Sequence, residues 1–240
     1  MTTLLVDAMN IFVRSYVVVP SMSEHGHHVG GTLGFLKSLG SYCRRFSPDR
    51  VIVVWEGGGS PRRRALLKDY KANRAAMPDD LIPQIEPIHE VIKALGIKIF
   101  VVEGVEADDV IGTLAAEAEQ KGISTIISTG DKDLAQLVTK NIKLVNTMKN
   151  EVLDIKGVEK KFGVKPEQIV DYLALVGDTS DNIPGVEKVG PKTAVNWLTE
   201  HNDIDTIIEK ADEFKGKVGE YLRAGIEQLK LSRQLTEIKK

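Results

Sequence analysis

The sequence is short of cysteine, of long apolar runs and of excess charge of either sign. Cys43 is the only cysteine in 240 residues, which excludes an intramolecular disulfide and a cysteine metal cluster and favours a reducing, cytoplasmic setting. No apolar run approaches the roughly 18 residues that a membrane-spanning helix needs. The opening stretch MTTLLVDAMN lacks the basic leader of a signal peptide. A formal net charge of −2 gives, taken alone, no support for a nucleic-acid partner.

What the sequence does contain is a regular alternation of apolar runs and helix-period stretches. With 42% hydrophobic residues, the chain can bury one large core, or a core and a smaller one. Residues 81–95 and 107–120 place apolar side chains on one helical face. Short β-branched runs that read as buried strands are TLLV (3–6), VIVVW (51–55), IKIFVV (97–102), STIIS (124–128) and IKLVN (142–146). The alternation predicts an α/β fold with a mostly parallel central sheet flanked by helices.

The pattern changes near residue 156, after which strands give way to short helices separated by glycine and proline. We therefore predict an α/β core over residues 1–155 and a helical region over residues 156–240. No internal repeat and no low-complexity tract interrupts either part.

Acidic residues follow the predicted strands, at the carboxyl-end edge of the sheet where open α/β folds bind their ligands. In STGDKDLAQL, Asp131 and Asp133 are one residue apart, although each makes ionisation of the other harder. A helix cap with a solvated neighbour explains this pair, and so does a metal ion. Further acids at strand exits and in GDTSDN, each explicable alone as a turn or helix-start residue, are Asp7, Glu56, Glu106, Asp108, Asp109, Asp178 and Asp181.

Together these carboxylates indicate a metal centre, because so many clustered anions would repel one another without a compensating cation. Carboxylate oxygens without histidine or cysteine suit Mg²⁺, with Mn²⁺ as a substitute. The number of carboxylates exceeds what one octahedral ion can use and predicts two ions, the usual apparatus for attack of water on a phosphodiester. Without these acids the rest of the chain is net positive, so the formal charge does not exclude nucleic acid.

A basic segment, SPRRRALLKDYKANR (residues 60–74), is the candidate nucleic-acid contact. A solvated, charged helix is one interpretation. The other is a phosphate-binding segment in which Tyr70 stacks on an unpaired base. The flexible GGGS that precedes it would place it above the acidic site, which favours the second. Its basic residues are Arg62, Arg63, Arg64, Lys68, Lys71 and Arg74.

A turn within IPGVEKVGPKTAVNWL (residues 183–198) is bracketed by Gly185 and Gly190. Pro191 suits the first position of a helix. Open backbone N–H groups there, with Lys192 nearby, suit a DNA phosphate. A plain helix–turn–helix packing unit is the alternative.

The motifs LLVDAMN, DYKANR, VEADD, STGDKDLAQL, GDTSDNIPGV and VGPKTA, in this order, resemble the structure-specific 5′ nucleases. That family comprises the flap endonucleases, the phage 5′–3′ exonucleases and the 5′-nuclease domain of bacterial DNA polymerase I. The resemblance spans nearly the whole chain and implies a PIN-like fold with a two-metal site. The ligands that it implies are Asp7, Glu106, Asp108, Asp109, Asp131, Asp133, Asp178 and Asp181.

The same resemblance implies how DNA would be held. Residues 60–90 would form a helical arch that a 5′ single strand passes through, with Lys71 and Arg74 at the scissile phosphate and Tyr70 on a base. Residues 183–198 would form a helix–hairpin–helix that contacts duplex DNA through Gly185, Lys188, Gly190 and Lys192. A K⁺ ion would be bound there by Gly185, Val186 and Val189.

We therefore expect a divalent-metal-dependent 5′–3′ exonuclease or flap endonuclease, acting as a cytoplasmic monomer on DNA with a 5′ flap or end. The departure is Glu56 in VVWEGGGS, where the family usually has aspartate. It motivates an alternative, a catalytically weakened protein that binds DNA junctions. A metal-dependent ribonuclease is a third candidate, which the hairpin at 183–194 argues against. The printed chain ends at LSRQLTEIKK with no polymerase region, and both a stand-alone nuclease and a fragment remain open.

Overall fold

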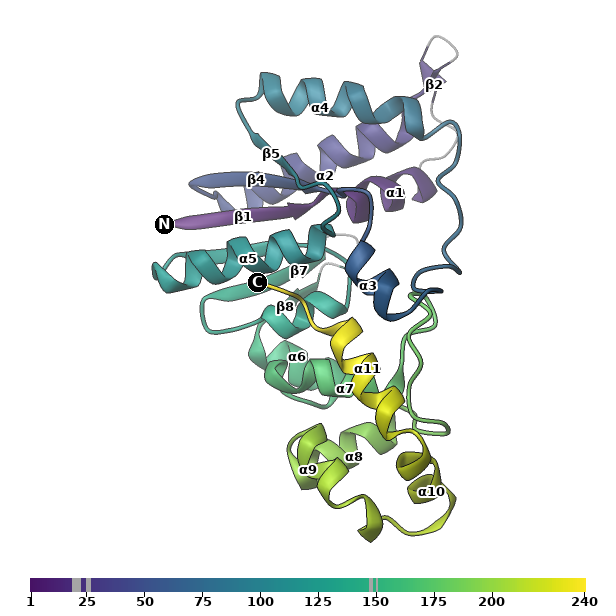
Figure 1. Ribbon diagram of the computed structural model, residues 1–240. Helices are drawn as coiled ribbons and strands as arrows, with labels where there is room; N and C mark the ends of the chain where they lie inside the picture. The colour runs from purple at the N-terminus through teal and green to yellow at the C-terminus, as the bar shows by residue number, and fades with distance from the viewer. Residues whose placement is uncertain (19–22, 25–26, 147–148, 150) are drawn as a thin grey trace.

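The structure, a computed structural model, describes residues 1–18, 23–24, 27–146, 149 and 151–240. Over these residues a six-stranded sheet with flanking helices forms one part, and a helical region adjoins it (Figure 1). The strands of the sheet are β1 (Thr2–Asp7), β4 (Arg50–Trp55), β5 (Lys98–Val101), β6 (Ser124–Ser128), β7 (Ile142–Asn146) and β8 (Glu151–Leu153). A separate short pair is formed by β2 (Ser23–Glu24) and β3 (His27–His28).

The strand order places β1 at the centre of the sheet. The order is β5-β4-β1-β6-β7-β8, and every pair is parallel except β7 with β8. The chain moves outward from β1 through β4 to β5 on one side and returns to β6 on the other. A crevice is therefore expected at the carboxyl ends of β1 and β6, where the direction of winding reverses. The mostly parallel sheet is confirmed, and the antiparallel β8 was not predicted.

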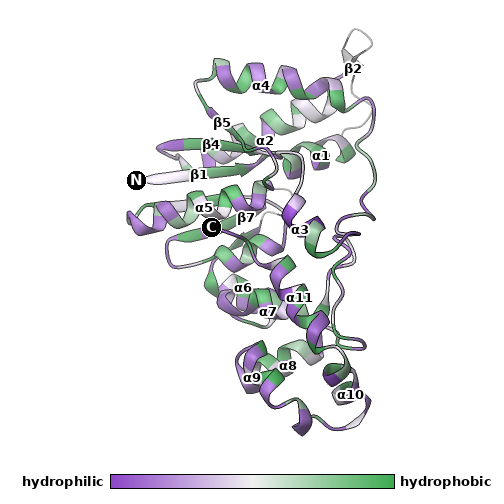
Figure 2. Cartoon of the chain, in the orientation of Figure 1, coloured by the Kyte–Doolittle hydropathy of each residue, from purple (hydrophilic) through white to green (hydrophobic). Residues whose placement is uncertain are grey.

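Helices cover both faces of the sheet. In the sheet-containing part they are α1 (Ala8–Val18), α2 (Gly30–Phe46), α3 (Pro61–Leu66), η1 (Ile82–Gln84), α4 (Ile85–Ala94), α5 (Ala107–Gln120) and η2 (Asp133–Leu137). In the helical region they are α6 (Ile155–Phe162), η4 (Pro166–Gln168), α7 (Ile169–Val176), α8 (Pro191–His201), α9 (Ile204–Glu209), η5 (Ala211–Glu213), α10 (Gly216–Ala224) and α11 (Ile226–Thr236). Figure 2 shows that α4 and α5 each carry hydrophobic and hydrophilic positions, as helices on a sheet do.

Alternation along β1 separates two packing layers. Leu4 and Val6 face a cluster formed with α1, α2 and α4. Leu5 faces a second cluster that continues from α5 into the helical region, where Leu173 of α7 and Leu229 of α11 belong to it. The apolar core is therefore continuous between the two parts, and the predicted division at residue 156 remains a prediction.

The segment predicted as a helical arch is helical only in pieces. Within residues 60–90 the helical stretches are α3, η1 and the start of α4, and turns or loop occupy most of the remainder. The segment folds onto the edge of the sheet where the parallel strands end (Figure 1). No helix in the described part of the chain is both long enough and apolar enough to cross a bilayer.

Candidate metal centre

Four carboxylates from four strand exits line one cavity. Asp7 is the last residue of β1, Glu56 follows β4, Asp108 lies in the first turn of α5, and Asp131 follows β6. All four line a cavity of about 330 Å³, together with basic side chains of the 60–74 segment. The parallel register explains the meeting, because strand ends that are far apart in sequence lie side by side at one edge of the sheet.

An adjoining cavity of about 320 Å³ is lined by the acids of STGDKDLAQL and of GDTSDN. Asp131 lines this cavity too, with Asp133 from η2 and with Asp178 and Asp181 from the loop after α7. The acids thus form two groups that share Asp131. In the observed arrangement, no three His, Cys, Asp or Glu side chains among the described residues converge closely enough to hold a metal ion.

The electrostatics of these cavities favour a cation. Burial is the largest cause of a rise in the pKa of Asp7 to about 6; the Thr129 hydroxyl, 2.7 Å away, opposes the rise, and the charge of Asp131 adds to it. Burial and the charge of Asp131 also raise the pKa of Asp108 and of Asp133 well above the ordinary value. The Oδ1 atom of Asp133 is buried without a hydrogen-bond partner. An all-oxygen donor set with surplus negative charge and an orphaned oxygen fits a hard divalent cation.

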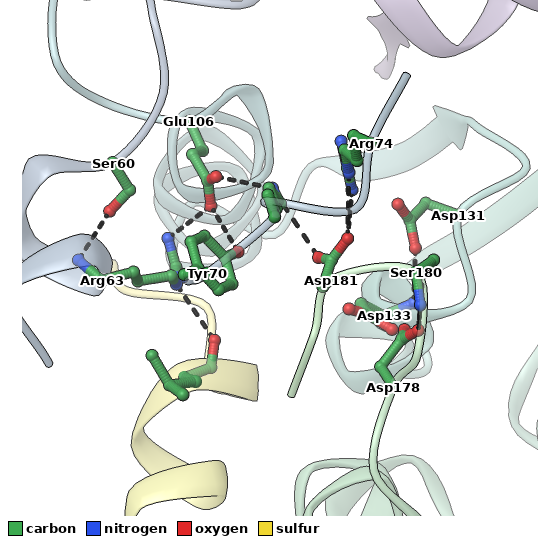
Figure 3. Close-up of polar contacts among 12 residues, drawn as sticks. Ser60, Arg63, Tyr70, Arg74, Glu106, Asp131, Asp133, Asp178, Ser180 and Asp181 are labelled. Carbon is green, nitrogen blue, oxygen red and sulfur yellow. Dashed lines mark hydrogen bonds and ion pairs between the residues drawn. The ribbon is translucent and has the colours of Figure 1, made fainter. Parts of the chain in front are cut away.

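Two of the predicted metal ligands, Glu106 and Asp109, contact Arg63 in an ion-pair cluster, and Figure 3 shows the contacts of Glu106. Arg63 contacts Glu106 at 2.7 Å and both oxygens of Asp109 at 2.7 and 2.8 Å. The Tyr70 hydroxyl donates to Glu106 at 3.1 Å, and Lys71 contacts its other oxygen at 2.5 Å. Successive residues of a helix start point in different directions, so Asp108 faces the acidic cavity while Asp109 lines a different one.

Two residues of this cluster, Arg63 and Tyr70, were predicted to contact DNA, and those roles stay predictions. Arg63 is buried and engaged with carboxylates, so it does not face DNA in this conformation. Tyr70 is only 6% exposed, so its ring offers no stacking surface. Arg62, Arg64 and Lys68 are exposed, as a phosphate-binding role requires.

Basic side chains also neutralise the acids of the GDTSDN loop. Arg74 contacts Asp181 at 2.5 Å, and Lys71 lies 3.8 Å from the same carboxylate. Lys132 contacts Asp178 at 2.8 Å. Burial raises the pKa of Asp178, but hydrogen bonds from Lys132 and Ser180 outweigh burial and hold it below the ordinary value. In this conformation, the positive charges of Lys71, Arg74 and Lys132 lie beside the carboxylates of Asp178 and Asp181.

Backbone contacts fix the basic segment on this loop. The Lys71 N–H donates to the Asp181 carbonyl at 2.9 Å, and the Asn182 side chain donates to the Asp69 carbonyl at 2.9 Å. Lys71 has a left-handed backbone, with φ of +59°. This turn directs Lys71 and Arg74 toward the acids, and both line the cavity with Asp7 and Asp108.

The hairpin at 183–190 is built around a close backbone crossing. A Cβ on Gly185 would lie 2.5 Å from the Val176 carbonyl, so only glycine fits. Helix α8 begins at Pro191 after Gly190, as predicted, and Lys188 and Lys192 are exposed beside this start. The helix–hairpin–helix role remains a prediction.

Two of the three predicted K⁺ ligands are backbone carbonyls that accept a hydrogen bond within the chain. The Gly185 carbonyl accepts from Gln228 at 2.7 Å, and the Val186 carbonyl accepts from the Val189 N–H at 3.0 Å. Each carbonyl has a second lone pair, so the K⁺ site stays a prediction.

Sequence reasoning missed Asn10 and Arg14 of α1. Arg14 donates to the Gly130 carbonyl at 3.2 Å, and the Asn10 side chain accepts from the Gly130 N–H at 2.9 Å. Both residues line both acidic cavities. Their spacing could have revealed them. Asn10 and Arg14 follow Asp7 by three and seven residues, which places them on the same face of the helix that begins after it.

Comparison with known proteins gives matches over the full length. The description "5'-3' exonuclease, N-terminal resolvase-like domain" matches residues 2–163, and "5'-3' exonuclease, C-terminal SAM fold" matches residues 164–240. The chain is 40% identical to a 5′–3′ exonuclease of Aquifex aeolicus, over 99% of this chain and 81% of that protein. It is 48% identical to DNA polymerase I of Pseudomonas aeruginosa over 81% of this chain, but spans only 22% of that polymerase.

Solved structures share the fold. The phage T5 5′-exonuclease, in a structure with bound divalent zinc ions, superposes with a TM-score of 0.89 over 99% of this chain and 90% of that one, at 22% identity. The catalytic core of Rad2 in complex with DNA substrate gives a TM-score of 0.60 over 95% of this chain and 71% of that one, at 19% identity.

Proposed function

The chain belongs to the 5′–3′ exonuclease family, and from this premise we propose that it is a divalent-metal-dependent nuclease that cuts DNA where a duplex meets a 5′ single strand. The observation that carries the proposal is the cavity shared by four strand-exit carboxylates and by Lys71 and Arg74 of the basic segment. The T5 relative with divalent metal and the Rad2 core with DNA substrate support the same two partners.

We propose that the carboxylates hold two ions. Asp7, Glu56, Asp108 and Asp131 would hold one, and the group of Asp131, Asp133, Asp178 and Asp181 would hold the other. Bound Mg²⁺ would supply Lewis-acid stabilisation of the phosphate and an activated water. Glu56 lines the cavity and its carboxylate accepts from the Gly59 N–H at 3.1 Å, which supports its place in the site despite its extra methylene.

The chain's own residues position the DNA. Lys71 and Arg74 are directed at the cavity, where a positive charge stabilises the charge that develops on a phosphate in the transition state. Exposed Arg62, Arg64 and Lys68 attract the backbone of the single strand. The start of α8, with Lys192, binds a phosphate of the duplex.

A cleavage assay tests the proposal. Labelled 5′-flap DNA, with a matched RNA as control, is incubated with the protein in Mg²⁺, in Mn²⁺ and in EDTA. We expect cutting of the DNA in Mg²⁺ and none in EDTA. Asp131→Ala should abolish cutting while leaving flap binding in Ca²⁺ within a few-fold, because this side chain faces the ions. Binding of the flap without cutting in either metal would establish the junction-binding alternative, and preferential cutting of RNA would establish the ribonuclease.

A further inference from the structure

The Arg63 guanidinium is fully hydrogen-bonded within the protein, whereas a residue that attracts DNA needs only an exposed positive charge. It comes from α3, is 5% exposed, and uses all five of the N–H donors that a guanidinium has. Three hydrogen bonds go to the carboxylates of Glu106 and Asp109. The other two go to backbone carbonyls, from Nε to Leu235 at 3.0 Å and from Nη2 to Glu237 at 3.0 Å. The residue therefore joins the start of α5 to the end of α11.

The carboxylate of Glu106 connects Arg63 to Tyr70 and Lys71 of the basic segment. One of its oxygens accepts from Arg63 and from the Tyr70 hydroxyl, and the other contacts Lys71. Glu106 is 2% exposed, so water does not compete freely for these bonds. Asp109 binds the Arg63 guanidinium bidentately, and such charge-assisted pairing is geometrically specific, so it also orients the single bond from Arg63 to Glu106. The position of the Lys71 ammonium consequently depends on Arg63, although the two side chains share only Glu106 as a partner.

The backbone next to the two carbonyls that bind Arg63, at Thr236 and Ile238, is hydrogen-bonded to the acidic loop that carries Asp133. Gln136 of η2 donates to the Thr236 carbonyl at 3.0 Å and to the Asp133 carbonyl at 2.9 Å, and its oxygen accepts from the Ile238 N–H at 3.0 Å. Helix α11 rises from the helical region toward α3 (Figure 1). Gln228 in its first turn and Ser232 near its middle donate to carbonyls of the 183–190 hairpin. One helix thus contacts both the hairpin and the residues that orient Lys71.

We propose that Arg63 is a positioning residue of the reaction: it binds the end of α11 and the Glu106 carboxylate together and thereby holds Lys71 at the acidic cavity. The inference rests on the proposed nuclease function. It makes Arg63 the one arginine of the RRR triplet whose contribution is not electrostatic attraction of DNA. Its effect should appear in the chemical step and should depend on Lys71.

A double-mutant cycle tests this dependence. Arg63→Lys keeps the charge but loses the planar fork that serves five acceptors. The single-turnover rate on 5′-flap DNA at saturating protein and the Kd for the same DNA in Ca²⁺ are measured for wild type, Arg63→Lys, Lys71→Ala and the double variant. Arg50→Lys, an exposed substitution at the start of β4, is the control for arginine replacement in general.

We expect Arg63→Lys to lower the single-turnover rate by about tenfold or more, since small misplacements of catalytic groups have large effects on rate. Its Kd should stay within about threefold of wild type. In the Lys71→Ala background the same change should lower the rate less than about threefold, because residues that act through one another are not additive.

Three results would overturn the proposal: a folded Arg63→Lys protein that cuts within twofold of wild type, an equal fold-loss in both backgrounds, or a loss that appears in Kd alone. If Arg63→Lys does not fold, Arg63→Ala is assayed with millimolar guanidinium, where recovery of the rate supports the proposal. Failure of both variants to fold would assign Arg63 to folding alone and overturn it. Wild type that does not cut refutes the proposed function itself, whereas wild type that cuts no better than Arg63→Lys refutes only the role of Arg63.

Discussion

Asp7→Asn should make the metal-free protein more stable at neutral pH, against the usual effect of altering a buried polar residue. The pKa of Asp7 is raised from 3.8 to about 6, chiefly by burial. The folded state therefore binds this proton more tightly than the unfolded state, and the free energy of unfolding falls as the pH rises through the window from 3.8 to about 6. At 1.36 kcal/mol per pKa unit, the deficit above that window is up to about 3 kcal/mol.

The amide of the variant removes the buried charge at nearly the same size. It also weakens the hydrogen bond from the Thr129 hydroxyl, 2.7 Å from the Asp7 carboxylate, and a bond of this kind contributes about 0.5–1.5 kcal/mol. The net gain in unfolding free energy above pH 7 should be about 1.5–2.5 kcal/mol. For a chain of this size that corresponds to a rise in Tm of roughly 3–10 °C. Near pH 4 the gain should vanish or reverse.

Calorimetry in EDTA at pH 4.5 and pH 7.5 measures the two Tm differences, with the exposed Asp212→Asn as control. Adding Mg²⁺ at pH 7.5 should raise the Tm of wild type more than that of Asp7→Asn, because the ion relieves a repulsion that the variant has already lost. A variant that is less stable than wild type by the same amount at both pH values would refute the reasoning. An equal rise in Tm of wild type and Asp7→Asn on addition of Mg²⁺ would also refute it.

Further predictions concern the DNA-facing residues and the departure at Glu56. Lys71→Ala should lower the single-turnover rate far more than it weakens DNA binding, whereas Arg62→Ala should mainly weaken binding; equal rate losses would contradict a special place for Lys71. Lys192→Ala should weaken binding to duplex-containing DNA and reduce the salt slope by about 0.9; an equal loss on a bare single strand would exclude a duplex contact. Glu56→Asp should keep the cleavage rate within about tenfold, a barrier change of roughly 1.4 kcal/mol, and Glu56→Gln should lower it more; full activity of Glu56→Gln would remove this carboxylate from the site.

Much of the sheet was predictable, because periodicity and β-branching report burial directly. The run IKLVN coincides with β7, and the helix-period stretch 107–120 coincides with α5. Strand β8 was missed because three residues, with their pairing set by the neighbouring β7, carry too little periodicity to be recognised. The family inferred from the ordered motifs is confirmed by the full-length matches.

The site was predictable in its residue types and only partly in its arrangement. Parallel strands dictate that Asp7 and Asp131 meet, and they line one cavity. Nothing in a run of arginines shows which one turns inward, so the burial of Arg63 emerged only from the packing of α3 against α5 and the end of α11. Asp108 and Asp109 are chemically alike, and only the rotation between neighbouring helical positions separates their surroundings.

The continuous core has a consequence for dividing this chain. One apolar cluster contains Leu5 and Ile127 of the sheet together with Leu173 and Leu229 of the helical region, and the carboxylates come from both sides of residue 163. A fragment ending near that residue would leave an uncovered apolar face and lack Asp178 and Asp181. Two halves made as separate polypeptides would therefore regain cleavage only by reassociating. The chain is thus suited to fragment complementation, in which DNA cleavage reports association of the two halves.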